Sequence, residues 1–351
     1  MTEPTTETPG EIPDGIDAPA VAAWFVEHAP GVEPPLSFSL ITGGHSNLTY
    51  KVTDSVGASW VLRRPPLGNI LVGAHDVARE HLLMSALVPT AVPVPPIVGL
   101  CQDEAVNGAD FYVMKFVDGH VLRYAEEASA AITSNGMSAL ATNLVDGLAA
   151  IHEVDLDAVG LADLGKREAY AARQLRTWLR QFTAMTSRDV PVITEVHDVL
   201  AATIPEQTQA TLVHGDYRLD NCLITAGGEV AAVLDWEICT LGDPLADLGF
   251  LLVYWVDRDD EFSPLGHDAT TAPGMARRAD LVDLYAARTG ADVSNMDWYF
   301  AFGSWRLACI LEGVYSRYIG GSSPEVPAEV ELFKESVINL AERAATLLGL
   351  R

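Results

Sequence analysis

The sequence of 351 residues has few basic side chains for its length. Lysine and arginine together number 22 against 48 aspartates and glutamates, so the formal net charge is −26. Nucleic-acid affinity comes mainly from basic side chains that replace counterions along the phosphate backbone. Anionic membrane surfaces attract proteins through the same side chains. We therefore expect neither nucleic acid nor a membrane among the partners.

Cysteines and long apolar runs are also scarce. The four cysteines stand singly, without the C-x-x-C spacing of metal and redox sites. Residues 1–17 lack the basic and apolar regions of a signal peptide. The apolar stretch at 248–256 is far shorter than the ~20 residues that span a bilayer. These absences predict a cytoplasmic protein with reduced thiols.

Several motifs of common enzyme classes are missing. The sequence contains no G-x-x-x-x-G-K-[ST], no strand-linked G-x-G-x-x-G, no G-x-S-x-G and no H-E-x-x-H. Their absence argues against P-loop nucleotide hydrolases, Rossmann oxidoreductases, serine hydrolases and zinc proteases. Hydrophobic residues nevertheless make up 49% of the chain and charged residues 20%, which is typical of a globular protein with a large core.

The periodicity of the apolar residues predicts a small β-rich region followed by a mainly helical one. Strand-like runs and one helix, at 74–87, precede Asp118-Gly119, and a β-rich segment at 211–236 interrupts the later helices. The predicted strands cover residues 36–41, 48–53, 59–64, 97–101 and 111–117. We expect an N-terminal extension with a short helix (1–34), an N-lobe (35–117) and a C-lobe (118–351), with a cleft between the lobes.

The β-rich segment carries residues that suit phosphoryl transfer. Two short strands flank a turn centred near Gly228, and residues equidistant from that centre should face each other. Asn221 and Asp235 are each seven positions from Gly228. Amide and carboxylate oxygens suit Mg²⁺ held jointly with substrate phosphates, and Asp216 adds a carboxylate that can serve as a base. The structural alternative is a polar hairpin in which Asp and Asn only form turns. This alternative explains any one of these residues well, but it explains the whole set less well.

The residues from His214 to Asn221 read His-Gly-Asp-x-x-x-x-Asn and are followed by a strand ending in Asp-Trp-Glu. This pattern resembles the signature of aminoglycoside phosphotransferase-like kinases, relatives of choline kinase and of protein kinases. The resemblance covers nearly the whole chain from about Leu36 onward and implies an α+β, protein kinase-like two-lobe fold.

The resemblance also implies roles for the residues of this segment. Asp216 matches the catalytic base that accepts the proton of the substrate hydroxyl, and Asn221 and Asp235 match the Mg²⁺ ligands. His214 and Asp247 match residues that support the catalytic loop. For Asp243 we prefer a structural interpretation, because Asp followed by Pro is typical of a helix N-terminus.

The expected nucleotide-binding region in the N-lobe departs from the family pattern at one position. The third strand ends in arginine where the family has a phosphate-binding lysine, and strand alternation lets only Arg63 or Arg64 point into the cleft. We assign Arg63, with Lys51 as the alternative. Glu80 lies on an apolar helical stripe, where a carboxylate needs a partner, and Arg63 is the natural one. A Glu80 that reaches water at the edge of the stripe is the other possibility.

The remaining nucleotide contacts are implied by the resemblance. The loop at 42–47 would cover the phosphates, with Ser46 as a side-chain donor, and the adenine would bind backbone groups near Lys115 and Val117. ATP with Mg²⁺ is the expected cofactor pair, and these side chains do not distinguish ATP from GTP. Ser304, Trp305, Arg306 and Glu312 have a spacing typical of a helix core and are left out of the site.

The leading hypothesis is an ATP- and Mg²⁺-dependent phosphotransferase whose acceptor is a hydroxyl of a small molecule. The Leu-Arg-Arg-Pro-Pro run at 62–66 resembles a branch linked to acyl-CoA dehydrogenases, which is implicated in phosphorylating hydroxylated acyl groups. Residues 214–261 contain eleven acidic and two basic side chains, a balance of −9, which favours a cationic amino sugar instead. The sequence does not indicate an oligomeric state.

Two alternatives belong to other classes. A pseudokinase or nucleotide-binding scaffold without turnover would explain the missing lysine, although Asp216, Asn221 and Asp235 are all present. A kinase that acts on protein hydroxyls ranks last, because the chain lacks an Ala-Pro-Glu and an activation segment of the protein-kinase kind.

Overall fold

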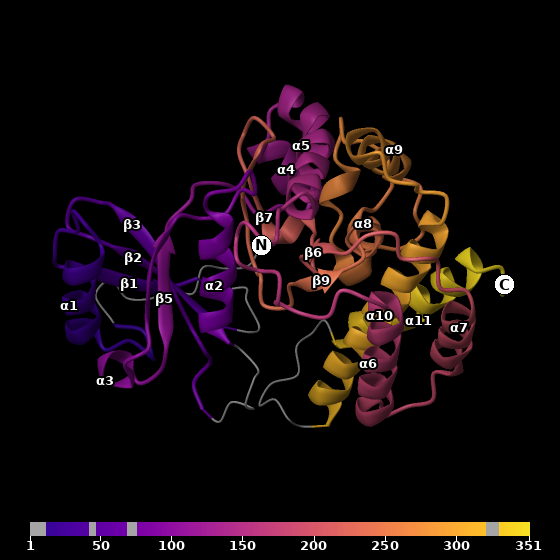
Figure 1. Ribbon diagram of the computed structural model, residues 1–351, viewed down its shortest axis with the longest axis horizontal. Helices are drawn as coiled ribbons and strands as arrows, with labels where there is room; N and C mark the ends of the chain where they lie inside the picture. The colour runs from indigo at the N-terminus through magenta and orange to yellow at the C-terminus, as the bar shows by residue number, and fades with distance from the viewer. Residues whose placement is uncertain (1–11, 42–46, 69–75, 321–329) are drawn as a thin grey trace. The chain divides into compact units, whose positions relative to one another are not determined.

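A computed structural model describes residues 12–41, 47–68, 76–320 and 330–351 (Figure 1). Contacts within the chain divide it into two units. The first comprises Met1–Asp118 together with Asp235–Glu237, and the second comprises Gly119–Leu234 together with Ile238–Arg351. A three-residue piece from the range expected for the C-lobe thus groups with the first unit.

The first unit contains a five-stranded antiparallel sheet in the order β1-β2-β3-β5-β4. Its strands are β1 (Ser37–Leu40), β2 (Leu48–Thr53), β3 (Ser59–Arg64), β4 (Ile97–Cys101) and β5 (Phe111–Lys115). The predicted strands at 48–53, 59–64 and 97–101 are confirmed. The other two are each two residues shorter than predicted, which is the usual uncertainty of strand ends.

The turn between β2 and β3 shows why this hairpin forms locally. The Asp54 carboxylate accepts hydrogen bonds from the backbone N–H groups of Val56 (3.1 Å) and Ala58 (2.8 Å). Gly57 has a φ of 90°, a conformation that glycine adopts without steric strain. The turn therefore satisfies its own backbone donors, and it fixes the register that pairs Thr53 with Ser59.

Two helices pack on opposite faces of this sheet (Figure 1). Helix α1 (Ala18–His28) is capped by Asp17, and its Trp24 and Phe25 join a core cluster with the sheet residue Trp60. Helix α2 (Val77–Leu87) is capped by Asp76 and turns a buried face, which includes Glu80, toward the other side. Helix α3 (Glu104–Asn107) is a single turn before β5. Because the side chains of β3 alternate between the two faces of the sheet, Arg63 faces only one of these helices.

The second unit is built around helix α10 (Met296–Ile319), which is buried along most of its length. It contacts α6, α7, α8 and α11. The other helices of this unit are α4 (Ala125–Ala131), α5 (Ser134–His152), α6 (Tyr170–Met185), α7 (Pro191–Ala202), α8 (Pro244–Tyr254), α9 (Arg278–Thr289) and α11 (Val330–Leu347), with 3₁₀ turns η1 (Leu219–Asn221), η2 (Pro264–Gly266) and η3 (Ala269–Thr271). Among the described residues, no helix is long and apolar enough to cross a membrane.

Two small antiparallel sheets lie in the second unit. One pairs β6 (Thr211–Val213) with β9 (Thr240–Gly242), and the other pairs β7 (Cys222–Ile224) with β8 (Val230–Val233). In the latter hairpin the register shifts between Leu223 and Ile224. The shift leaves one extra residue in β8, as in a β-bulge.

The observed hairpin register differs from the predicted one by one residue at its open end. Cys222 pairs with Val233, and the N–H of Leu234 donates to the carbonyl of Asn221 at 2.8 Å. The expectation that Asn221 stands opposite Asp235 is therefore wrong, because the turn is centred on Gly227, where Ile224 pairs with Val230, and the extra residue in β8 brings only Leu234 opposite Asn221. Asp235 instead belongs to the segment that groups with the first unit.

Candidate active site

The loop after β6 is held in place by a buried carboxylate of α8. Asp247 is 1% exposed and accepts hydrogen bonds from the backbone N–H groups of His214 (2.6 Å) and Gly215 (2.8 Å). His152 Nε2 lies 3.4 Å from the same carboxylate and donates to it, because an ionised carboxylate can only accept; His152 Nδ1 lies 2.7 Å from the hydroxyl of Tyr285. Burial acts to raise the pKa of Asp247, but these hydrogen bonds hold the pKa below its ordinary value. The carboxylate is therefore ionised at neutral pH and fixes the start of the loop.

The imidazole of His214 is used for structure. Its Nδ1 accepts from the N–H of Asp216 at 3.2 Å, so the proton is on Nε2, which donates to the carbonyl of Leu234 at 3.0 Å. A neutral ring with both nitrogens engaged has no position free to take a substrate proton. This agrees with the loop-supporting role expected for His214.

Asp216 and Asn221 lie in contact. Asn221 Nδ2 donates to both the Asp216 carbonyl and Asp216 Oδ2, each at 2.8 Å. Because both partners are acceptors, the atom that faces them must be the amide nitrogen, and Oδ1 remains as the oxygen available to a cation. Asp216 keeps 22% of its side chain exposed. The arrangement presents a held carboxylate beside an amide oxygen, as a phosphoryl-transfer site requires.

The first unit brings together Arg63, Glu80 and Asp235. Arg63 Nε lies 3.1 Å from Glu80 Oε2, and its Nη2 lies 3.0 Å from Asp235 Oδ1. The predicted pairing of Arg63 with Glu80 is confirmed, and Arg64 points elsewhere, to the carbonyls of Gly15 and Asn107. Arg63 is thus the arginine placed beside the predicted metal ligand.

The electrostatics of this cluster follow from its burial. Burial raises the pKa of Glu80 to about 7, against the opposing effect of the Arg63 charge. Burial also acts to lower the pKa of Arg63, but the carboxylates of Glu80 and Asp235 outweigh it and hold the arginine charged. Asp235 has a φ of 66°, a left-handed conformation that is uncommon outside glycine. Such conformations persist where the surrounding structure imposes them, often at functional sites.

A model of the phosphotransferase enzyme family matches residues 37–281. The chain belongs to this family. Acyl-CoA dehydrogenase family member 10 of Mus musculus is 34% identical over 322 residues, which are 90% of this chain and 30% of that protein. A crystal structure of a provisionally assigned aminoglycoside phosphotransferase from Ralstonia eutropha JMP134 is similar with a TM-score of 0.80 at 32% identity, covering 95% of this chain and 98% of that one.

A more distant structure has the same fold. The GDP complex of aminoglycoside 2'-phosphotransferase-IIIa has a TM-score of 0.63 at 15% identity and covers 92% of this chain and 99% of that one. The α+β, protein kinase-like fold is therefore confirmed. The first curated relatives are longer proteins, of which the chain spans 30% to 43%.

For the other residues of this phosphotransferase that were predicted to bind the nucleotide, the structure gives fewer contacts. Ser46 lies outside the described residues. The N–H of Lys115 donates to the carbonyl of Pro96 at 2.8 Å, and its Nζ lies 4.5 Å from the centre of the Trp60 ring. Lys115 can therefore offer only its backbone carbonyl to a base. In the part of the chain that the structure describes, the N–H of Val117 has no hydrogen-bond acceptor, so it remains a candidate donor.

Arg306 of α10 contacts the loop that carries Asp216, and sequence reasoning left it out of the site. Arg306 is 3% exposed, and its guanidinium donates to the carbonyl of Gly215 at 2.6 Å. It also stacks on the rings of Phe250 (4.4 Å) and Trp178 (5.5 Å). The helical spacing predicts only that Arg306 is buried, and no local signal connects it to Gly215, 91 residues earlier in the chain.

Arg218 lies between two carboxylates of the phosphotransferase loop. Its Nε is 3.3 Å from Asp216 Oδ1, and its Nη1 is 2.7 Å from Asp220 Oδ2. The guanidinium also lies over the ring of Tyr254, 4.7 Å from its centre. Asp220 receives a further contact from His267 Nδ1 at 2.8 Å. Sequence reasoning also missed Arg218, although it lies inside the signature.

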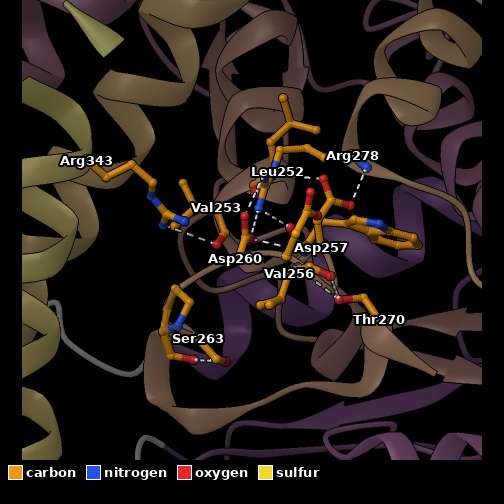
Figure 2. A network of polar contacts seen from close by, with 12 residues as sticks. Leu252, Val253, Val256, Asp257, Asp260, Ser263, Thr270, Arg278 and Arg343 are labelled. Carbon is orange, nitrogen blue, oxygen red and sulfur yellow. Dashed lines mark hydrogen bonds and ion pairs between the residues drawn. The ribbon is translucent and has the colours of Figure 1, made fainter. Parts of the chain in front are cut away.

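Several acidic side chains after this loop have cationic partners. Figure 2 shows Asp257 and Asp260 turned toward Arg278, which also donates to the carbonyl of Leu252. The exposed Asp259 pairs with Arg277. Asp243 instead caps α8 through the N–H of Leu245, as predicted, and accepts from the hydroxyl of Tyr299. Three arginines from outside the segment, Arg63, Arg277 and Arg278, thus offset three charges of its balance of −9.

Proposed function

We propose that this phosphotransferase moves the γ-phosphate of ATP to a hydroxyl of a small molecule and uses Mg²⁺ to do so. The observation that carries the proposal is the pair formed by Asp216 and Asn221. Its carboxylate is held in place and partly exposed, and its amide oxygen points away from that carboxylate. Phosphoryl transfer depends mainly on positioning and on charge stabilisation, which such a loop can supply.

The family resemblance implies Asn221 and Asp235 as the ligands of a magnesium ion. Their amide and carboxylate oxygens suit it chemically, and Mg²⁺ commonly takes only one or two protein ligands besides substrate phosphates. In the described residues no group of three or more His, Cys, Asp or Glu could hold a metal. When bound, the ion would neutralise charge on the phosphates.

The protein's own groups have separable tasks in this proposal. Asp216 would accept the proton of the acceptor hydroxyl as the new O–P bond forms. Arg63 would pair with nucleotide phosphates through two donors while Glu80 keeps it oriented. Asp247 and Arg306 would hold the loop from its two sides, through the N–H groups and the carbonyl of Gly215.

As the acceptor we propose a hydroxylated acyl compound first and an amino sugar second. The relative from Mus musculus is named an acyl-CoA dehydrogenase family member, and the chain matches less than a third of it. The Ralstonia relative is assigned to the aminoglycoside phosphotransferases. Part of the acidic run that favoured a cationic acceptor is paired with arginines, as for Asp260 with Arg278. The electrostatic attraction of an amino sugar is therefore weaker than the charge count of the sequence suggests.

A panel of acceptors tests this function. Purified protein with Mg·ATP, hydroxyacyl-CoAs, aminoglycosides and choline-like alcohols should transfer labelled phosphate to at least one hydroxyl. Asp216→Ala should lower the turnover of that acceptor by ~10²–10⁴-fold, because the base and its positioning are both removed. Asp259→Asn, at an exposed ion pair outside the loop, is the matched control and should leave turnover unchanged.

A nucleotide-binding protein without turnover is the second candidate, favoured by Arg63 in the place of the family lysine. Stabilisation by Mg·ATP in a thermal shift measurement, with no transfer to any acceptor, would support it. Transfer that is lost in Asp216→Ala would exclude it.

A further inference from the structure

We propose that Arg218 is a positioning residue that holds Asp216 in the orientation in which it accepts the substrate proton. The inference rests on the proposed function, in which Asp216 is the base. It adds a residue whose role follows from contacts inside the second unit.

The carboxylate of Asp216 is contacted by two donors. Asn221 Nδ2 donates to Oδ2 at 2.8 Å, and Arg218 Nε lies 3.3 Å from Oδ1 and 3.4 Å from Oδ2, to which it donates. A carboxylate held by one donor can still rotate about its last bond. A cation that lies against both of its oxygens restricts that rotation, which is what precise alignment with a reacting hydroxyl demands.

Arg218 is itself held rigidly. Its Nη1 lies 2.7 Å from Asp220 Oδ2, and its guanidinium stacks on the ring of Tyr254. Asp220 is in turn contacted by His267 Nδ1 at 2.8 Å and by Arg123 at 3.9 Å. Only 18% of the Arg218 side chain is exposed. A planar guanidinium can bind two carboxylates at fixed angles, whereas an ammonium group cannot reproduce that geometry.

This arrangement differs from a surface ion pair. Arg277 and Asp259 also form a close pair, but both side chains are mostly exposed, and such pairs contribute little. The Arg218 contacts lie on the loop of the proposed base and continue through Asp220 to a second segment of the chain. Arg277→Ala therefore serves as the matched control.

A double-mutant cycle tests the role. Turnover of the best acceptor is measured for the wild type, Arg218→Ala, Asp216→Ala and the double variant, with Arg218→Lys and Arg277→Ala alongside. We expect Arg218→Ala to lower kcat by ~10–100-fold, the effect of misplacing a reacting group. The KM for Mg·ATP should stay unchanged. Arg218→Lys should restore part of kcat, and Arg277→Ala should match the wild type.

The decisive comparison is in the Asp216→Ala background. If Arg218 acts through Asp216, its removal there has little further effect, because the group that it positions is already absent. If removing Arg218 lowers kcat in the Asp216→Ala background as much as it does in the wild type, Arg218 acts on the phosphoryl group directly. That result would overturn the proposal. Unchanged kcat in Arg218→Ala overturns it as well.

A structural readout separates this inference from the proposed function. If the wild type transfers phosphate to no acceptor, the proposed function fails, and crystal structures of the wild type and Arg218→Lys still test the positioning. A rotated Asp216 carboxylate in Arg218→Lys supports the inference, and an unchanged one overturns it. Should Arg218→Ala fail to fold, Arg218→Lys and Asp220→Asn carry the kinetic test, with intermediate losses of kcat expected.

Discussion

Replacing Asp247 by asparagine should affect both the stability and the turnover of this protein. Asp247 is buried, and its carboxylate accepts from two consecutive N–H groups of the catalytic loop, at 2.6 and 2.8 Å. An asparagine of the same shape has one oxygen for these two donors. Its amide nitrogen must then face a backbone N–H or His152, which also donates.

The magnitude follows from these contacts. One buried donor left without an acceptor costs about 1–3 kcal/mol, and the remaining hydrogen bonds lose the contribution of the charge. Together we expect a loss of about 3–5 kcal/mol in the free energy of unfolding, in the range found when one partner of a buried charged network is removed. For a unit of this size, 1 kcal/mol corresponds to about 2–4 °C in Tm.

Urea unfolding followed by tryptophan fluorescence, together with steady-state phosphotransfer, measures the two effects. Asp259→Asn removes an exposed carboxylate and should stay close to the wild type. If Asp247→Asn unfolds at the same urea concentration as Asp259→Asn, the support that we assign to Asp247 is wrong. Lost stability with normal kcat would refute its connection to Asp216.

The difference in stability between the wild type and Asp247→Asn should change with pH in a definite direction. The pKa of Asp247 in the folded protein lies below its ordinary value, because hydrogen bonds to the ionised form outweigh burial. Such a group stabilises the fold above its unfolded pKa of about 3.9, and the stabilisation is lost as pH falls through the lower folded pKa. The stability gap between wild type and Asp247→Asn should be constant near neutrality and shrink below about pH 4.

Two further predictions concern nucleotide binding and the hairpin. Arg63→Met should raise the KM for ATP by ~10-fold or more, because methionine lacks the phosphate donors and leaves Glu80 buried without its cation. Arg63→Lys should raise the KM for ATP much less. Equal KM values for the two variants would contradict the assignment. Gly228→Ala should destabilise the fold by about 2 kcal/mol or more, because Gly228 has a φ of 82° and an added Cβ would lie 2.2 Å from the carbonyl oxygen of Gly136. Gly227→Ala should be nearly neutral in the same unfolding assay, because the three atoms nearest to the added Cβ belong to the flexible Glu229 side chain.

Local signals predicted much of the fold correctly. The strands at 48–53 and 59–64 are bounded by a turn whose backbone donors Asp54 satisfies, so their limits depend on nearby residues alone. The cap formed by Asp243 is local in the same way. The pairing of Arg63 with Glu80 could also be inferred, because a carboxylate on an apolar helical face requires a cation.

Other features depend on contacts between distant segments. The bulge in β8 shifts the register by one residue, and equal spacing about a turn cannot reveal it. The apolar stretch at 248–256 proves to be largely the buried helix α8, which presents Asp247 to the loop. The acidic run overstated the local charge, because Arg278, the partner of Asp257 and Asp260, lies beyond the counted segment.

The sequence by itself determined the family, the fold class and the signature from His214 to Asn221, because these depend on residue types at short spacing. Only the tertiary structure decided how the signature is held. Arg306 donates to the Gly215 carbonyl from 91 residues later in the chain, and His267 contacts Asp220 from a separate loop. Hydrogen bonds over such separations arise from packing of the whole unit, so no local pattern of apolar or charged residues encodes them.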